Sequence, residues 1–322
     1  MRRRDFIKVI AVSAAGWPLA ARAQPQRMRR IGVLLFARPD RAIVSPLIQK
    51  LEALGYIEGK TAAIEYRDGN GMREYIIQAA DELVRLNPEV IFAFGGDIAP
   101  IIKRATATIP IVAVVSNDPV ASGLVQSLAR PGGNITGLTQ VHDALAGKSV
   151  ELLKDIVPAV SRVAILWNPE HADPEFRETE RAARALGVKL QSLEVRRPED
   201  LAGAFQAAER ERAEAMIVVG SRLLSLNRRL IGDFAAKHRM ILLGNPAWLM
   251  EIGALGSYGP DEAELLRRAA TYIDKILKGA RPADLPMQQP TTFELTINLK
   301  VAQRLGITVP PTVIARADRV IE

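Results

Sequence analysis

Residues 109–119 read IPIVAVVSNDP, an apolar run of mostly β-branched residues that stops at a polar cluster. Such a run is typical of a strand that is buried on both faces of a parallel sheet. The chain continues through 128–138, LARPGGNITGL, which predicts a Pro-Gly-Gly turn and then another short strand. Because parallel sheets bind ligands beyond the carboxyl ends of their strands, we expect a binding edge at 116–118.

The same alternation of apolar strands and amphipathic helices extends in both directions from this stretch. Toward the N-terminus, strands are expected at 31–36, 62–66 and 90–94. Toward the C-terminus, the pattern starts again with strands expected at 162–167, 188–195, 215–219 and 240–243. Alternating strands and helices predict parallel sheets with right-handed crossovers, and two successive runs predict an α/β protein of two doubly wound lobes.

The C-terminal part does not end with the second run, and this predicts a hinge. Further strands are expected at 254–259 and 293–297, with a proline-bracketed extended segment, LPMQQP, at 285–290. A tail of this length allows three crossings between the lobes. We expect lobe 1 to comprise 28–140 plus 252–284, and lobe 2 to comprise 141–251 plus 285–322.

The first 23 residues are interpreted as an export signal peptide. A basic start that includes Arg3-Arg4 precedes a short apolar run from Val9 to Leu19, and Ala21-Arg22-Ala23 has the form of a cleavage site. The run is too short to span a membrane, which takes about 20 residues. The arginine pair is typical of a twin-arginine signal, with a general secretory signal as the alternative. We therefore expect a periplasmic protein.

Charge and composition exclude several classes of function. The signal segment carries five basic residues and one acidic residue, so the formal charge of +7 falls to +3 without it. We accordingly expect no nucleic-acid partner. The absence of cysteine excludes thiol catalysis and cysteine metal sites. The three histidines, which are scattered at 142, 171 and 238, favour no metal centre, and we expect no cofactor.

No catalytic motif is recognisable in the sequence. A Walker loop and a Gly-x-Ser-x-Gly elbow are both missing. Gly95-Gly96-Asp97 follows an expected strand but lacks the third glycine of a dinucleotide fingerprint, and a turn with a helix cap explains it equally well. The sequence therefore predicts a protein that is not an enzyme.

What remains is a set of polar residues at the carboxyl ends of the expected strands, together with one aromatic residue. The candidate ligand-binding residues are Arg38, Gly95, Gly96, Asp97, Asn117, Asp118, Asn168, Ser221, Arg222, Asn245 and Tyr258. Asp97 or Asp118 could pair with an ammonium group, and Arg38 or Arg222 with a carboxylate. Together they would suit a small zwitterion held between lobes, although a cap or a turn explains each residue singly.

Several motifs distributed along the chain carry a family resemblance. They are GYIEGK at 55–60, ATIPIV at 107–112, LARPGGNITG at 128–137, LWNP at 166–169, SYG at 257–259 and QPTTFEL at 289–295. On these motifs, the sequence from Arg30 to Glu322 resembles the ABC-transporter substrate-binding proteins of the type 1 periplasmic fold. The closer similarity is to the branch with members that bind tryptophan, tyrosine or phenylalanine.

The resemblance implies a monomer of two hinged lobes that encloses a small solute and delivers it to a permease and ATPase in the membrane. Its binding loops correspond here to 95–97, Asp118, Asn168, Ser221 and Tyr258. One departure bears on the ligand. Members of the family commonly have Gly-Thr after the third strand, whereas this chain has Gly96-Asp97. An acid at that position favours solutes that carry an amine or another cation.

Three other readings remain open at the level of sequence. A ligand-sensing partner of a membrane receptor would have the same features as a transport protein. A Rossmann-like enzyme would need a phosphate loop and a base. A sugar-responsive transcription regulator would need an N-terminal helix-turn-helix of about 50–60 residues, where this chain has its signal segment.

Overall fold

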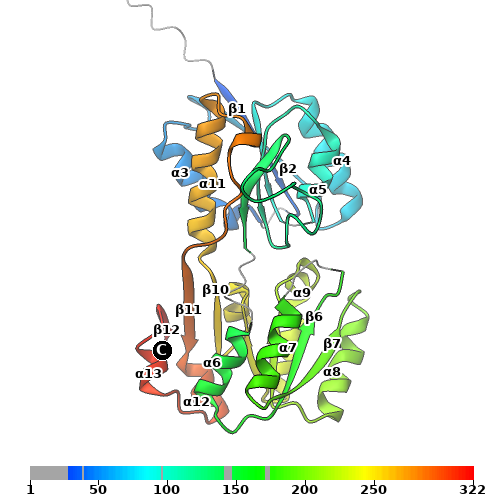
Figure 1. Ribbon diagram of the computed structural model, residues 1–322, viewed down its shortest axis with the longest axis vertical. Helices are drawn as coiled ribbons and strands as arrows, with labels where there is room; N and C mark the ends of the chain where they lie inside the picture. The colour runs from blue at the N-terminus through cyan, green and yellow to red at the C-terminus, as the bar shows by residue number, and fades with distance from the viewer. Residues whose placement is uncertain (1–27, 38–39, 96, 141–146, 171–174) are drawn as a thin grey trace, which may run out of the picture.

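The computed structural model describes residues 28–322, except 38–39, 96, 141–146 and 171–174. The segment interpreted as a signal peptide lies outside the described residues, as do Arg38 and Gly96. Figure 1 shows two α/β lobes, one above the other, each built on its own sheet. The expected fold class, two parallel-sheet lobes, is confirmed. No helix in the described part of the chain has the length and apolar character needed to cross a membrane.

The first lobe is built on a five-stranded sheet with the order β2-β1-β3-β4-β5, in which every pairing is parallel. Its strands are β1 (Arg29–Leu35), β2 (Ala62–Asp68), β3 (Val90–Phe94), β4 (Ile111–Val115) and β5 (Ile135–Thr139). The helices are α2 (Asp40–Ile43), α3 (Ser45–Ala53), α4 (Arg73–Arg85) and α5 (Ala99–Ala105), joined later in the chain by α11 (Glu262–Leu277). Strands β3, β4 and β5 are buried along their whole length, as their apolar sequences predict.

The second lobe is built on a seven-stranded sheet with the order β12-β11-β10-β9-β8-β6-β7. Its strands are β6 (Arg162–Trp167), β7 (Lys189–Glu194), β8 (Ala215–Val218), β9 (Ile241–Gly244), β10 (Gly256–Pro260), β11 (Phe293–Asn298) and β12 (Arg319–Ile321). Its helices include α6 (Lys148–Ile156), α7 (Glu175–Ala185), α8 (Asp200–Arg210), α9 (Arg222–Leu226), α10 (Arg228–Lys237), α12 (Leu299–Leu305) and α13 (Pro311–Ile314). A 3-10 helix, η2 (Ala247–Ile252), follows β9, and another, η3 (Pro282–Asp284), follows α11. The pairing of β10 with β11 is antiparallel, whereas the other pairings are parallel.

Each sheet has an apolar core on both faces. In the first lobe, α3 and α11 cover one face and α4 and α5 the other. In the second, α6, α7 and α12 lie over one face, and α8, α10 and η2 over the other. Two independent cores allow the lobes to move as separate bodies about the segments that join them.

The chain crosses between the lobes three times: first between β5 and α6, then between β10 and α11, and last between Gln288 and β11. Two of these crossings differ from the expected boundaries. The strand expected at 254–259 was placed with lobe 1, whereas β10 pairs with β9 and belongs to the second sheet. Residues 285–288 were placed with lobe 2, whereas Gln288 pairs with β5: its N–H donates to Gly137 and its carbonyl accepts from Thr139. Hydrophobic periodicity identifies an extended segment but not the sheet edge it joins, since both sheets offer unpaired edge groups.

Two of the family motifs have structural explanations. In GYIEGK, the Tyr56 hydroxyl donates a 2.9 Å hydrogen bond to the carboxylate of Asp274 on α11, which is buried. In the Pro-Gly-Gly-Asn turn, the Asn134 amide donates to the carbonyls of Thr106 and Ile109, both at 2.9 Å. The turn thereby fixes the spacing between the end of α5 and the start of β4, and it contributes to folding.

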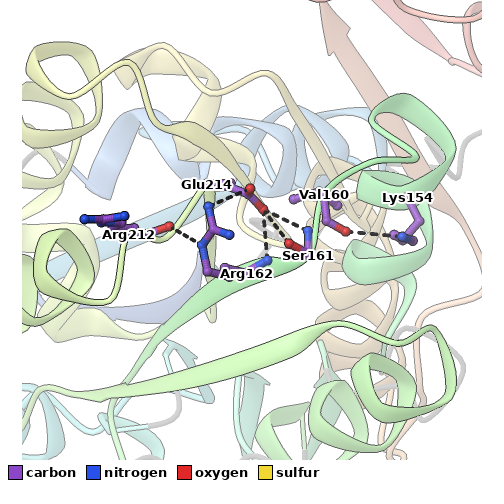
Figure 2. Close-up of polar contacts among 6 residues, drawn as sticks. All are labelled: Lys154, Val160, Ser161, Arg162, Arg212 and Glu214. Carbon is purple, nitrogen blue, oxygen red and sulfur yellow. Dashed lines mark hydrogen bonds and ion pairs between the residues drawn. The ribbon is translucent and has the colours of Figure 1, made fainter.

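A polar cluster at the amino edge of the second sheet holds the starts of β6 and β8 together (Figure 2). The Glu214 carboxylate accepts hydrogen bonds from the backbone N–H groups of Ser161 (2.8 Å) and Arg162 (2.9 Å) and pairs with the Arg162 guanidinium at 2.8 Å. Burial raises the pKa of Glu214, but these hydrogen bonds and the charge of Arg162 outweigh it, so the pKa lies below its ordinary value.

Candidate functional site

The carboxyl edges of the two sheets face one another. Strand β5 ends at Thr139, after which the chain goes to the second lobe, and β10 ends at Pro260, directly before α11 of the first lobe. Because β5 is parallel to the other strands of its sheet, and β10 to β9, both sets of carboxyl ends point toward the junction. The loops that follow these strands therefore meet between the lobes, as the sequence predicts.

Two loops of the first lobe, after β1 and after β3, are in direct contact with one loop of the second lobe. Arg222, at the start of α9, reaches across from the second lobe, and its guanidinium carbon lies 4.5 Å from the ring centroid of Phe36. Its Nε atom is 4.0 Å from a carboxylate oxygen of Asp97. Its Nη2 atom would lie 3.0 Å from a Cβ added to Gly95, whose φ of +123° also favours glycine. Of the candidates, Gly95, Asp97 and Arg222 are thus brought together.

Asp118, Asn168 and Ser221 lie at the same edges, but each has a local structural role. One oxygen of Asp118 accepts the N–H groups of Val120 (2.8 Å) and Ala121 (3.1 Å). Asn168 accepts the N–H of Glu170 at 2.9 Å. The Ser221 hydroxyl caps α9 by accepting from Leu224 at 3.3 Å. Side chains of this kind are common in Asx turns and N-caps, and the turns they hold shape the loops. Asn117 lies two residues beyond the buried end of β4, and its amide oxygen is buried.

Asn245 connects three segments of the second lobe. Its side-chain oxygen accepts the N–H of Gly220 at 3.0 Å, and its amide nitrogen donates to Glu175 on α7. Glu175 is buried, with 7% of its surface exposed. Gly220 directly precedes Ser221 and Arg222, so this network fixes the loop from which the Arg222 side chain extends.

Tyr258 lies in β10, the strand that leads to the second crossing between the lobes. It packs against the core of the second lobe, and its ring centroid is 6.1 Å from that of Phe293. Its neighbour Gly259 lies close to the backbone of Asn245, which brings β10 to the edge of the loop described above.

Sequence reasoning missed Phe36, Glu175 and a pair of residues beside the crossings. Phe36 follows directly on β1, and the available signal was an aromatic residue at a strand's carboxyl end. Glu175 follows a stretch that gives no sign of its burial. The amide of Gln140, just after β5, donates at 2.8 Å to Glu262 in the first turn of α11, joining two crossings.

The described residues also form a hollow of about 790 Å³ in the first lobe, between the edge strand β2 and α4. Its lining includes Arg41, Tyr66, Tyr75 and Glu82, and none of the candidate residues. In the parts of the chain that the structure covers, no group of three His, Asp or Glu residues could hold a metal ion. The inter-lobe contact at Arg222, where both lobes contribute side chains, is therefore the stronger candidate site.

Comparison with known proteins shows what this chain is similar to. A solved structure from Vibrio cholerae, a conserved domain protein, shares 29% identity with a TM-score of 0.84, covering 91% of this chain and all of that one. An ABC domain from Streptococcus pneumonia in complex with L-Trp shares 25% identity with a TM-score of 0.83, covering 91% and 100%. The tyrosine-binding protein of Clostridioides difficile (strain R20291) is 22% identical over 253 residues, which cover 78% of this chain and 72% of that protein.

The sequence profile described as ABC transporter substrate binding protein matches residues 31–321, which is nearly the whole described chain. The two-lobed architecture agrees with this match. The protein therefore belongs to the ABC transporter substrate-binding protein family.

Proposed function

We propose that this protein is the solute-binding component of an ABC importer and works outside the cytoplasm, in the periplasm. It takes a small polar solute, an amino acid or a related zwitterion or carboxylate, between its lobes and delivers it to a permease and ATPase in the membrane. Family membership and the export signal expected at 1–23 support this role. The class of solute is supported by two similar proteins, one named for tyrosine binding and one holding L-Trp.

The observation that carries the proposal is the meeting of both lobes at Arg222. A cation from the second lobe, an aromatic ring from the first and the Asp97 carboxylate lie within a few ångströms of one another. This set supplies a partner for each part of an amino acid: Arg222 for its carboxylate, Asp97 for its ammonium group and Phe36 for an apolar face.

The two-lobed fold explains how residues from both lobes could signal to the permease that a solute is bound. A solute that contacts both lobes favours the closed arrangement by its differential affinity over the open one. The permease can then read closure from the outer surfaces, so no catalytic group is required of the binding protein.

Thermal unfolding of the chain from residue 24 tests solute binding. The twenty amino acids, small carboxylates and amines are added singly. A solute at 100 times its Kd should stabilise the protein by about 2.7 kcal/mol, and small-angle scattering should show a smaller radius of gyration. Arg222→Ala should abolish the shift, and the matched control Arg228→Ala, which breaks a surface pair with Glu251, should retain it. If no solute changes either quantity, the proposed binding function is wrong.

The importer role needs a separate measurement. Solute-loaded protein should stimulate ATP hydrolysis by membrane vesicles that contain its permease and ATPase, and solute-free protein should stimulate it less. Solute binding without any such stimulation would contradict delivery to a transporter and favour the sensing role instead.

A further inference from the structure

The environment of the Arg222 guanidinium has the chemistry of a cation-binding site on the first lobe. One side is the ring of Phe36, whose centroid is 4.5 Å from the guanidinium carbon. The Asp97 carboxylate lies 4.0 Å from Nε, and Gly95 leaves the space that a side chain would occupy. An aromatic face beside a carboxylate, with a glycine admitting close approach, is a site that binds ammonium as well as guanidinium groups.

The geometry of the pair shows that the contact is loose. Strong guanidinium–carboxylate pairs have N···O distances of about 2.7–2.9 Å and are often bidentate, whereas the Arg222–Asp97 distance is 4.0 Å. The Asp97 side chain is 36% exposed and that of Arg222 is 20% exposed. Water therefore reaches both partners, and separating them carries a modest cost compared with breaking a buried ion pair.

We propose that, while the protein is empty, the Arg222 guanidinium occupies the position that the solute's ammonium group takes in the complex. Solute binding then exchanges the two cations. The inference rests on the proposed function, because it concerns the same site. The solute's ammonium group replaces the guanidinium between Phe36 and Asp97. The released guanidinium then binds the solute's carboxylate.

The exchange accounts for selectivity toward solutes with both charges. Asp97 has a cationic partner before and after binding, and Arg222 has an anionic one, so neither charge is left without a partner as the lobes close. A solute without an ammonium group would displace Arg222 and leave Asp97 unpaired. A solute without a carboxylate would give the released guanidinium no anion in exchange for Asp97. The favoured class is therefore an α-amino acid.

Calorimetry with charge-deleted ligands tests the exchange. The probes are L-tryptophan and L-tyrosine, or another of the twenty amino acids if that binds better, each with its N-acetyl and carboxamide derivatives. Asp97→Asn should weaken binding of the amino acid by about 10–100-fold, the range for a hydrogen bond to a charged group. The same variant should strengthen binding of the N-acetyl derivative, because displacing Arg222 then no longer leaves the Asp97 carboxylate without a cationic partner.

Arg222→Met removes the charge but keeps an apolar side chain of similar length. It should weaken binding of the amino acid and the N-acetyl derivative, and it should strengthen binding of the carboxamide, because no guanidinium has to be displaced. Arg228→Met and Asp155→Asn, which alter surface ion pairs elsewhere in the second lobe, are the matched controls and should change none of the affinities. The empty Arg222→Met protein should also have a larger radius of gyration, because its contact between the lobes is weakened.

Several outcomes would overturn the exchange. If Asp97→Asn and Arg222→Met reduce the affinities for all three ligand forms by the same factor, their role is merely structural. If wild-type affinity persists in both variants, neither residue contacts the solute. Either result leaves the proposed function intact as long as the wild-type protein binds an amino acid. If the wild-type protein binds none, the exchange and the proposed function both fail.

Discussion

The hydroxyl of Tyr56 donates a 2.9 Å hydrogen bond to Asp274, a carboxylate with only 8% of its residue surface exposed. This contact joins the loop after α3 to α11, which enters the first lobe from the second. Lys278 also pairs with Asp274, at 2.8 Å. The tyrosine of the GYIEGK motif is therefore a structural residue that secures α11 in the first lobe.

Tyr56→Phe should lower the free energy of unfolding by about 1–3 kcal/mol, because a buried acceptor loses a donor. Urea denaturation measures this, with the exposed Tyr75→Phe as the control.

Burial, followed by the hydrogen bond to Asp274, raises the pKa of Tyr56 to about 12. A raised pKa gives stability that is full below about pH 10 and lost as the pH rises toward 12. The wild type should therefore lose stability more steeply than Tyr56→Phe over that range; parallel curves would contradict the assignment.

Glu214→Gln should destabilise the second lobe by about 1–3 kcal/mol, since a charged acceptor of two backbone N–H groups is neutralised (Figure 2). The pKa of Glu214 is lowered in the folded state, so its contribution is present above the ordinary pKa of a glutamate and is lost as the pH falls. Urea midpoints between neutral and acidic pH should converge for wild type and variant. Glu211→Gln, which alters an exposed pair with Lys189, should behave like wild type.

The substitution Asp118→Asn distinguishes the role of Asp118 in its turn from the role of its negative charge. Asparagine retains an oxygen that accepts from Val120 and Ala121, so Tm without solute should stay close to that of wild type. Asp118→Ala should lower the free energy of unfolding by about 0.5–2 kcal/mol, as for a lost cap. If the carboxylate contacts the solute, Asp118→Asn should also weaken binding in calorimetry. Wild-type affinity in Asp118→Asn would restrict Asp118 to its turn.

Arg268→Ala should loosen the third crossing. On α11, the Arg268 guanidinium donates to the side chain of Gln288 and, at 3.2 Å, to that of Thr291. Hydrogen exchange at the Thr139 amide, which donates to Gln288, should become faster. Arg267→Ala is the control on the same helix, because its partners Asp261 and Glu264 belong to the start of α11. Equal protection of Thr139 in the two variants would show that Arg268 does not hold this segment.

Much of the fold was predictable because buried parallel strands are apolar along their whole length. Ile111–Val115 and Val90–Phe94 show this directly, and their polar successors lie at the expected edge. The sheet that β10 joins was not predictable, since edge pairing depends on backbone groups that every sequence has. The contact between Phe36 and Arg222 joins lobes whose relative position no local pattern encodes.

The candidate site was predictable as a region and less so residue by residue. Asp118, Asn168 and Ser221 accept local turn and cap hydrogen bonds. Oxygen atoms of this kind are also typical ligand contacts, so the sequence does not separate the two roles. Asp97 differs, since the N-cap position of α5 is Ile98 and the Asp97 carboxylate faces Arg222 instead. That distinction depends on the other lobe and only the structure provides it.

The antiparallel pairing of β10 with β11 couples two of the three crossings mechanically. Pro260 lies opposite Phe293, and the Asp261 N–H donates to the carbonyl of Thr292 at 3.0 Å, so both crossings leave the second lobe at one point. Slipping one strand by a residue would turn the buried Leu295 toward the opposite face. These two crossings therefore bend at a common point, and a reporter domain inserted between 289 and 292 would lie beside it.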